Sequence, residues 1–207
     1  MKRLAVLLAV PLLLTGCAPS SEPTPAVSSN PPAGAKIYSK LDDAGIEQIK
    51  SSKTALLDMT SGNLRKSDVG LQDGTGHAPD VHTSGLMDLF IEAPYGVIAA
   101  HTDRLRLNGM NNRADFSEIT YFLTATSRED LATLIRDGVG RYGIDSTSAE
   151  DWIESVSAKP DQMSDFAITP GTSTGLQVTY DLRYDGTKDT QVIIVHVNPL
   201  PTTGRSS

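Results

Sequence analysis

The chain contains a single cysteine, Cys17, in its 207 residues. One cysteine excludes an internal disulfide, so a domain built from this chain must be held together by its hydrophobic core alone. The neighbours of Cys17 are equally informative, because the cysteine directly follows a short apolar stretch and precedes a segment rich in proline and serine. The same residue therefore constrains both the fold of the chain and its location.

Residues 1–16 have the layout of an export signal. Lys2 and Arg3 form a basic head, an apolar run extends from Leu4 to Leu14, and small residues follow. A helix that crosses the bilayer needs about 20 apolar residues, so this run is too short for a permanent transmembrane span. We therefore expect residues 1–16 to be a signal peptide and the protein to act outside the cytoplasm.

Residues 14–17, Leu-Thr-Gly-Cys, resemble the lipobox of bacterial lipoproteins. The resemblance implies cleavage before Cys17 and a diacylglyceryl group, carrying fatty acids such as palmitate, on its sulfur. Two acyl chains suffice for stable anchoring, because each buried methylene contributes about 0.8 kcal/mol. We expect lipidation of Cys17 and attachment to the outer side of the cell membrane. The alternative is an ordinary secretory signal that leaves a free thiol.

The net charge of the chain argues against two classes of partner. Removal of residues 1–16 leaves 16 basic and 25 acidic residues, so the net charge becomes −9. An acidic protein has no electrostatic attraction to nucleic acid or to anionic lipid headgroups. Aromatic residues make up only 5% of the chain, which also disfavours a platform for stacked bases. We expect no nucleic-acid partner and membrane contact only through the lipid.

The composition divides the rest of the chain into three parts. Residues 17–36 form the lipid anchor and a tether, because proline and serine are frequent there and apolar residues are rare. Residues 37–200 have the length of one domain and can bury a sizeable core. Residues 201–207 are expected to be a disordered tail, and we expect the tether to be disordered as well.

The first part of the domain gives weak signals for secondary structure. Apolar residues at helical spacing permit a helix over residues 41–58, although Gly45 and the polar stretch 51–54 weaken it. Residues 70–85, GLQDGTGHAPDVHTSG, contain several glycines and a proline, which predicts a loop. We expect this loop to be mobile and to form part of a binding surface.

The middle of the domain is clearer. Residues 96–109 and 116–125 are alternating or β-branched runs joined by a turn-rich segment, which predicts a hairpin. A helix follows from an N-cap at Ser127 to a C-terminal stop at Gly143. Ser148, with an acidic residue three positions later, predicts the start of a second helix that ends before residue 160.

The last part of the domain returns to strands. Residues 176–184 alternate between apolar and polar, which is typical of a strand in a sheet with one wet face, and residues 191–197 form another strand. His196 alternates with apolar residues and is expected to be half-buried. With a further strand from Asp165, the pattern predicts an α+β domain: an antiparallel sheet of about five strands, with two or three helices packed on one face.

Residues 122–144, FLTATSREDLATLIRDGVGRYGI, are followed by a closing hairpin, and together they resemble the LppA-like lipoproteins of actinobacteria. The resemblance covers about half of the chain. It rests on the order of the elements and on a helix that ends in an aromatic-glycine pair. This chain lacks the additional cysteines of that group. The resemblance implies no particular activity.

Three short strings match known motifs but have the wrong context. Residues 171–175, GTSTG, match a nucleophile elbow, and Asp181 and His196 follow in a hydrolase-like order, but a strand follows where the elbow needs a helix. Residues 138–143, GVGRYG, match a dinucleotide-binding loop but close a helix instead of opening one. Residues 200–204, LPTTG, match a sortase signal without the hydrophobic stretch that such a signal needs. We expect no cofactor.

Residues 73–82 contain a cluster of potential metal ligands. Asp73, His77, Asp80 and His82 fall within ten residues, and His101 lies on the next predicted strand. Imidazole and carboxylate groups are suited to zinc and related divalent ions. The spacing matches no established metal motif, and solvated polar loop residues are the simpler interpretation.

These observations favour a binding or accessory module of the cell envelope over an enzyme. The expected partner is a protein or another envelope component. The alternative is a divalent-metal-binding protein or a metal-dependent enzyme that uses residues 73–82.

Overall fold

The computed structural model describes residues 30, 36–74, 76, 78–188 and 190–201. The predicted signal peptide, Cys17 and most of the tether lie outside these residues, as do His77 and nearly all of the predicted tail. The disorder expected for the tether and the tail therefore stays a prediction.

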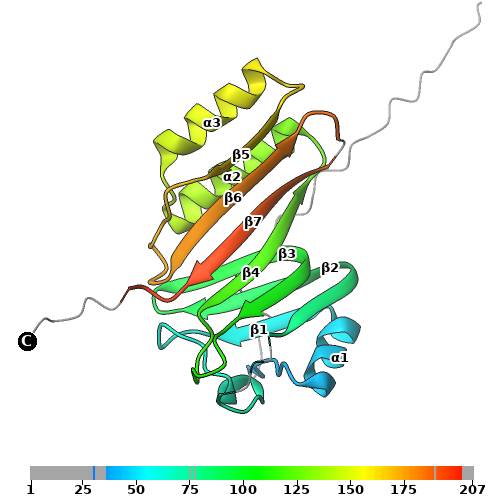
Figure 1. Ribbon diagram of the computed structural model, residues 1–207, viewed down its shortest axis with the longest axis vertical. Coiled ribbons are helices and arrows are strands. Elements are labelled where there is room, and N and C mark those ends of the chain that lie inside the picture. Colours follow the sequence, from blue (N-terminus) through cyan, green and yellow to red (C-terminus); the bar gives the residue numbers. More distant parts are fainter. Residues whose placement is uncertain (1–29, 31–35, 75, 77, 189, 202–207) are drawn as a thin grey trace, which may run out of the picture.

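The described chain forms an α+β domain in which a seven-stranded sheet carries α-helices (Figure 1). The elements in chain order are α1 (Asp43–Ser52), β1 (Thr54–Asp58), a 3-10 turn (Ser67–Val69), β2 (Asp80–Ala93), β3 (Gly96–Asn108), β4 (Glu118–Ala125), α2 (Arg128–Tyr142), α3 (Ser146–Ala158), β5 (Met163–Ala167), β6 (Gln177–Asp185) and β7 (Gln191–Asn198).

The strands lie in the order β1-β2-β3-β4-β7-β6-β5. β1 and β2 are parallel, and all other neighbouring strands are antiparallel. The sheet is therefore mixed and larger than the antiparallel sheet of about five strands that the sequence predicts. The five predicted strands correspond to β3, β4, β5, β6 and β7, whereas the sequence pattern predicts neither β1 nor β2.

β1 occupies the end of the region predicted to be a helix over residues 41–58. α1 ends early because Lys53 adopts the left-handed conformation, with φ 55° and ψ 33°, and its N–H donates to the carbonyl of Ile49. The apolar residues after this turn, Ala55 to Leu57, are all buried in β1. The predicted helix is thus too long, since its last five residues, Thr54–Asp58, form a strand.

β2 begins inside the region predicted to be a loop over residues 70–85. Val81 is fully buried and pairs with Leu105 of β3, so the strand is already part of the core at this point. The register then shifts between His82 and Met87, where Gly85 has a positive φ of 84°. The loop prediction is therefore wrong for residues 80–85, which belong to β2: residues 80–82 pair with β3, and residues 83–85 lie in the irregular part of the strand.

The caps of α2 are those predicted, while the start of α3 differs. The Ser127 side chain accepts a hydrogen bond from the N–H of Asp130, and Gly143 ends the helix in the left-handed conformation. In α3 the N-cap is Asp145, whose carboxylate accepts from the N–H of Ser148. α3 therefore begins before Ser148, which lies inside its first turn instead of capping it.

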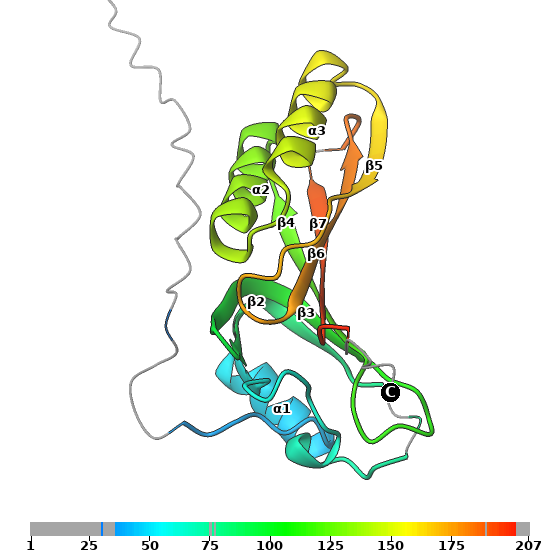
Figure 2. The ribbon, with the colours of Figure 1, turned by 90° about the vertical axis from the view of Figure 1, so that its left-hand side faces the viewer.

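The helices cover one face of the sheet, which we call the inner face. Buried side chains from α1, α2 and α3 join one core cluster with inward-pointing strand residues such as Tyr121, Tyr180 and Val195. In the side view, α2 and α3 lie on the same side of β6 and β7 (Figure 2). The opposite side of the sheet, which we call the outer face, carries the residues that alternate with this core.

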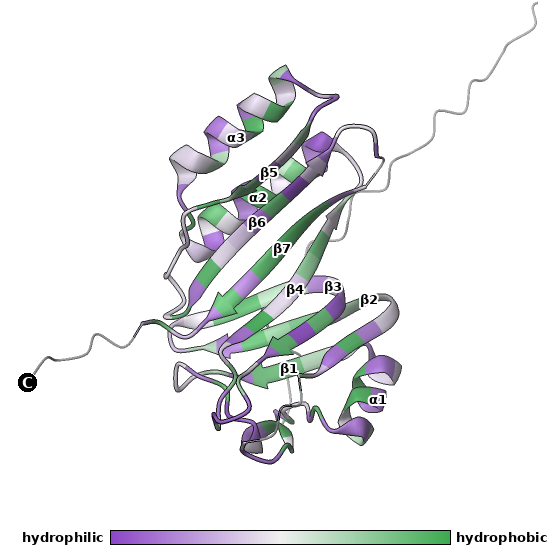
Figure 3. Cartoon of the chain, in the orientation of Figure 1, coloured by the Kyte–Doolittle hydropathy of each residue, from purple (hydrophilic) through white to green (hydrophobic). Residues whose placement is uncertain are grey.

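The alternation predicted for residues 176–184 is confirmed. Buried and half-exposed residues alternate along β6 and again along β7, and Figure 3 shows polar and apolar residues alternating along β6. His196 is half-buried on β7, as its pattern predicts. One face of this part of the sheet is therefore packed and the other is wet.

The start of the described domain is fixed to β2 by two contacts. The ammonium of Lys36 lies 2.5 Å from Oε1 of Glu92, and the Tyr38 hydroxyl donates to Oε2 of Glu92 at 2.6 Å. The hydrogen bond to the Glu92 carboxylate is the main reason why the pKa of Tyr38 is raised to about 12. Lys36, assigned to the tether from composition, thus already contacts the folded domain.

Candidate functional site

The candidate site is the outer face of the sheet, where the strand register aligns polar residues in rows. One row runs from β2 through β3, β4 and β7 to β6 and consists of Asp80, Arg106, Thr120, His196 and Thr179. Because side chains two residues apart on a strand share a face, His82 and Arg104 lie beside this row on the same side of the sheet.

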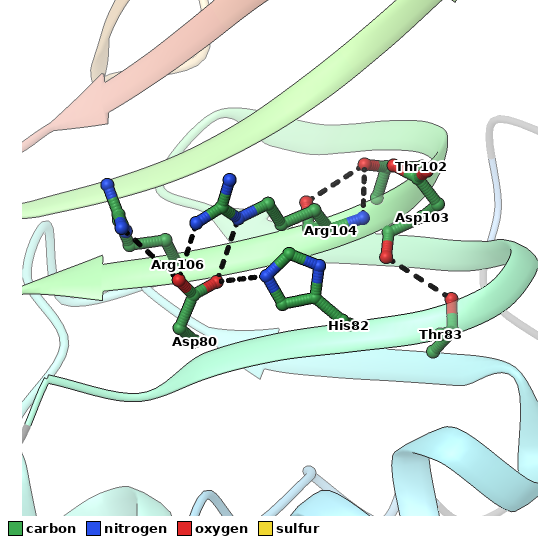
Figure 4. A network of polar contacts seen from close by, with 7 residues as sticks. All are labelled: Asp80, His82, Thr83, Thr102, Asp103, Arg104 and Arg106. Carbon is green, nitrogen blue, oxygen red and sulfur yellow. Dashed lines mark hydrogen bonds and ion pairs between the residues drawn. The ribbon is translucent and has the colours of Figure 1, made fainter.

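A network of arginines around one carboxylate occupies the β2–β3 end of this face (Figure 4). Arg104 binds Asp80 with two hydrogen bonds, from Nε to Oδ1 at 2.9 Å and from Nη2 to Oδ2 at 2.6 Å. Arg106 donates to the same Oδ2 at 3.2 Å. Nε2 of His82 lies 3.2 Å from Oδ1. One carboxylate thus holds two guanidinium groups on the outer face.

The surroundings of Asp80 keep its carboxyl group ionised. The hydrogen bonds from Arg104 lower the pKa of Asp80 to about 2, and partial burial opposes this effect. The positive charges of Arg104 and Arg106 act in the same direction as the hydrogen bonds and contribute to this value. The Asp80 carboxylate is therefore charged above about pH 4 and can hold both guanidinium groups there.

The centre of the outer face is apolar. Phe122 on β4 pairs with Ile194 on β7, and both side chains are half-buried. The guanidinium of Arg104 lies over the Phe122 ring, with 5.1 Å between Cζ and the ring centroid. Val192 continues the apolar surface along β7. The arginine network therefore borders a strip of half-buried hydrophobic side chains.

A second polar cluster surrounds Glu118 at the start of β4. One oxygen of Glu118 accepts hydrogen bonds from Asn108 at 2.7 Å and from Thr120 at 2.9 Å. The other oxygen lies 3.2 Å from Nδ1 of His196. Burial raises the pKa of Glu118, but these neighbours outweigh it and the pKa is lowered. This carboxylate is therefore held in its charged form.

The β5–β6 end of the face carries a third charged group. Arg183 donates to Asp181 at 2.6 Å and lies 2.8 Å from the Asp165 carboxylate on β5. Two carboxylates share one guanidinium here, whereas two guanidiniums share one carboxylate at Asp80. The charge at this end is therefore negative, and the charge at the arginine network is positive.

Every histidine in the described chain contacts a carboxylate. The contacts of His82 and His196 are described above. The third histidine, His101, has its Nδ1 2.7 Å from Oδ1 of Asp88, its register partner on β2. Each imidazole is thereby fixed next to an acidic group.

The structure brings together only part of the predicted metal cluster. Asp80 and His82 are neighbours, whereas Asp73 lies beside Arg65 at 3.6 Å and His77 is outside the described residues. No group of three or more histidine, cysteine, aspartate or glutamate side chains that could hold a metal ion occurs in the described chain. Metal binding that involves His77 stays a prediction.

The arginines at Asp80 are not among the residues predicted for the site, although a signal for them exists. Arg104 and Arg106 alternate with buried Leu105 and Leu107 in a predicted strand, so their shared face follows from the pattern. A search of the sequence for carboxylates and imidazoles alone misses the cations that hold Asp80.

The hydrolase-like string does not form a catalytic group. Ser173 lies in a turn that precedes β6, where the N–H of Gly175 donates to the carbonyl of Thr172. Asp181 binds Arg183 and His196 contacts Glu118, both on the outer face. Residues 171–175 thus form a turn before a strand, in agreement with the strand that the sequence predicts after this string.

Five depressions among the described residues are open to solvent. One of about 320 Å³ lies between α1 and residues 36–40, and one of about 610 Å³ lies among loops near Gly62 and Asn198. Phe122 and Ile194 line neither of them. The three further depressions are not lined by Phe122 or Ile194 either, so the centre of the outer face belongs to none of the five.

Comparisons with protein families, with characterised proteins and with solved structures find no match to this chain. Within the described residues, no helix has the length and apolarity needed to cross a bilayer.

Proposed function

We propose that the protein is an extracytoplasmic lipoprotein, anchored through Cys17, whose domain binds a macromolecule of the cell envelope through the outer face of the sheet. The observation that carries the proposal is the composition of this face. An apolar strip at Phe122 and Ile194 is bordered by charged networks at both ends.

This arrangement has the anatomy of a protein-binding surface. Protein interfaces combine an apolar centre, from which charged residues are depleted, with a polar rim. Arginine and aromatic residues are enriched at such sites, and here Arg104 lies directly on Phe122. The strands hold these side chains in place, so the surface needs little rearrangement to bind.

The shape of the surface favours a macromolecule over a small molecule. Small ligands are bound in concave pockets that bury most of their surface. The centre of the outer face lines neither of the two depressions described above. A broad partner that covers several strands at once is therefore the better fit.

The anchoring part of the proposal is supported by the sequence. The basic head, the short apolar run and residues 14–17 have the layout of a lipoprotein signal, and residues 17–36 have the composition of a tether. A tether of this kind would hold the domain near the membrane while leaving the outer face free to meet a partner.

Photo-crosslinking in intact cells tests the proposed binding surface. A photoreactive amino acid replaces Thr124, which is exposed on β4 on the outer face, or Thr133, which is exposed on α2 and serves as the matched control. We expect a discrete crosslinked product from position 124 and none from position 133. Equal labelling from both positions, or no product at all, would contradict the proposal.

A further inference from the structure

The outer face is complementary to itself, and we propose that its partner is a second copy of this chain, stacked face to face. The inference rests on the proposed function, because it names the occupant of the same surface. The two-fold axis would run parallel to the strands, between β4 and β7. Each β4 would then face the β7 of the other copy, and each β3 would face the other β6.

The central row of the face shows the complementarity most directly. In this row Phe122 on β4 pairs with Ile194 on β7, and Ile194 pairs in turn with Asp181 on β6. At the other end of the row, the guanidinium of Arg104 on β3 lies over the Phe122 ring. Rotation about the proposed axis places the Phe122 ring of one copy on the Ile194 side chain of the other. It also places the Arg104 guanidinium opposite the Asp181 carboxylate, twice in each dimer.

In the neighbouring rows, the same rotation brings no two like charges opposite each other. In the row of Thr120, the axis sets Thr120 opposite His196 and Arg106 opposite Thr179. In the next row the axis sets Asn108 opposite Gln177. Asn108 lies on β3 and Gln177 on β6, and each of these strands is the second one from the axis. Charged groups in these rows therefore meet either an opposite charge or a neutral polar group.

A two-fold axis perpendicular to the strands would bring like charges together. It would lay β3 on β3, so that the arginines of one copy meet the arginines of the other. Like charges that face each other in an interface cost several kcal/mol. The distribution of charge along the face, positive at β3 and negative at β5 and β6, therefore selects the axis parallel to the strands.

The groups involved keep hydrogen-bonding capacity for a partner. Within the described chain, Arg104 uses Nε and Nη2 for Asp80, and Asp181 receives Arg183 on Oδ2. Nη1 of Arg104 and Oδ1 of Asp181 are thus available for a contact between copies. Two aligned sheets that stack face to face lie about 10 Å apart.

The expected dimer is weak. Strands are about 4.8 Å apart, and residues on one face recur about every 7 Å, so the rows on β3 to β6 cover on the order of 400 Å² in projection. Stable complexes bury about 800 Å² per partner, so this contact belongs to the transient class. A weak contact of this kind would be favoured where the chains are concentrated on one membrane.

Co-purification of two differently tagged full-length copies from the same cells tests the dimer. Wild-type copies are extracted in excess mild detergent, and recovery of the second tag with the first is measured. R104E should reduce recovery about tenfold or more when both copies carry it, because a carboxylate at position 104 then faces the Asp181 carboxylate of the other copy. D181R should do the same, because a guanidinium then faces the guanidinium of Arg104.

The decisive sample carries R104E on one copy and D181R on the other. One of its two contacts pairs the introduced carboxylate with the introduced guanidinium, and the other pairs the native Arg104 with the native Asp181. Both contacts are thus between opposite charges, so recovery should return to near the wild-type value. A variant that had merely lost its fold could not be rescued in this way. Failure of the mixed pair to recover, or unchanged recovery of the two matched pairs, would overturn the proposal.

The outcome can be separated from that of the proposed function. If wild-type copies do not co-purify but position 124 still crosslinks to a different protein, self-association is wrong and the outer face remains a binding surface. If position 124 gives no product at all, the proposed function itself fails.

Discussion

The ring of Tyr180 on β6 lies directly on Gly138 of α2, where an added Cβ would be 2.6 Å from Cε2 of the ring. Tyr142 of the same helix meets Tyr180 edge to face, with 6.3 Å between ring centroids. A side chain at position 138 would push the helix away from the sheet. The glycine therefore sets the distance between the two layers of the domain.

We predict that G138A lowers the free energy of unfolding by about 1–3 kcal/mol, the usual cost of overfilling a packed core. Gly140 provides a matched control on the same helix, because a Cβ there would meet nothing within 4 Å. G140A should be neutral or should stabilise the protein by up to about 1 kcal/mol, since alanine favours a helix more than glycine does. Urea unfolding of both variants measures the difference. Equal effects would show that Gly138 has no special packing role.

The arginine network predicts a loss of stability in acid. The pKa of Asp80 in the folded protein is about 2, below the value of about 3.9 for an unfolded aspartate. Its ionised form therefore stabilises the fold above about pH 4, and this contribution disappears as the pH falls from about 4 to 2.

We expect D80N to be less stable than the wild type at pH 6 and to lose less of its remaining stability between pH 4 and 2. Urea unfolding at several pH values tests this. E154Q, in which an exposed carboxylate on α3 is replaced, should keep the wild-type dependence on pH. Parallel curves for D80N and the wild type would show that the network does not couple protonation to folding.

Lipidation of Cys17 predicts a change in location. Cys17→Ser removes the sulfur to which the diacylglyceryl group would be attached, so the protein should leave the membrane fraction or retain its signal peptide. Cell fractionation with mass spectrometry of the N-terminus distinguishes these results. A fully membrane-bound variant of unchanged mass would contradict the lipid anchor.

The metal alternative predicts linked responses of two histidines. Asp80 is already held by two guanidinium groups, which repel a cation, so we expect near-stoichiometric zinc, copper or nickel to leave the melting temperature unchanged. Histidine NMR signals provide the second measurement. If one ion shifts the signals of His77 and His82 together and raises the melting temperature, the protein binds metal at residues 73–82.

The sequence predicts the parts of the fold in which local signals agree with packing. Ser127 and Gly143 carry the capping chemistry that a helix needs, and the strict alternation in residues 176–184 reflects a strand with one buried face. These signals lie within a few residues, so they can be recognised without knowledge of distant contacts. The α+β class follows from the order of such elements.

The first two strands escape prediction because their local signals conflict with their final environment. β1 follows α1 without a glycine or proline, and only the left-handed conformation of Lys53 separates them. The start of β2 has the composition of a loop because it is polar and contains Gly85, and its pairing with β3 is what makes it a strand. The outer face escapes prediction for a related reason, since its rows join residues from five strands that are distant in sequence.

The pairing of β4 with β7 has a consequence for the order in which the molecule is made. Tyr121 pairs with Val195, although α2, α3, β5 and β6 lie between them in the chain. Contacts between such distant segments slow folding. Until β7 has been synthesised, the sheet formed by β1 to β4 ends in an open edge at β4, to which another polypeptide could add a strand. A chain truncated before Gln191 would keep that edge permanently and should therefore aggregate, even though it contains every residue of the arginine network.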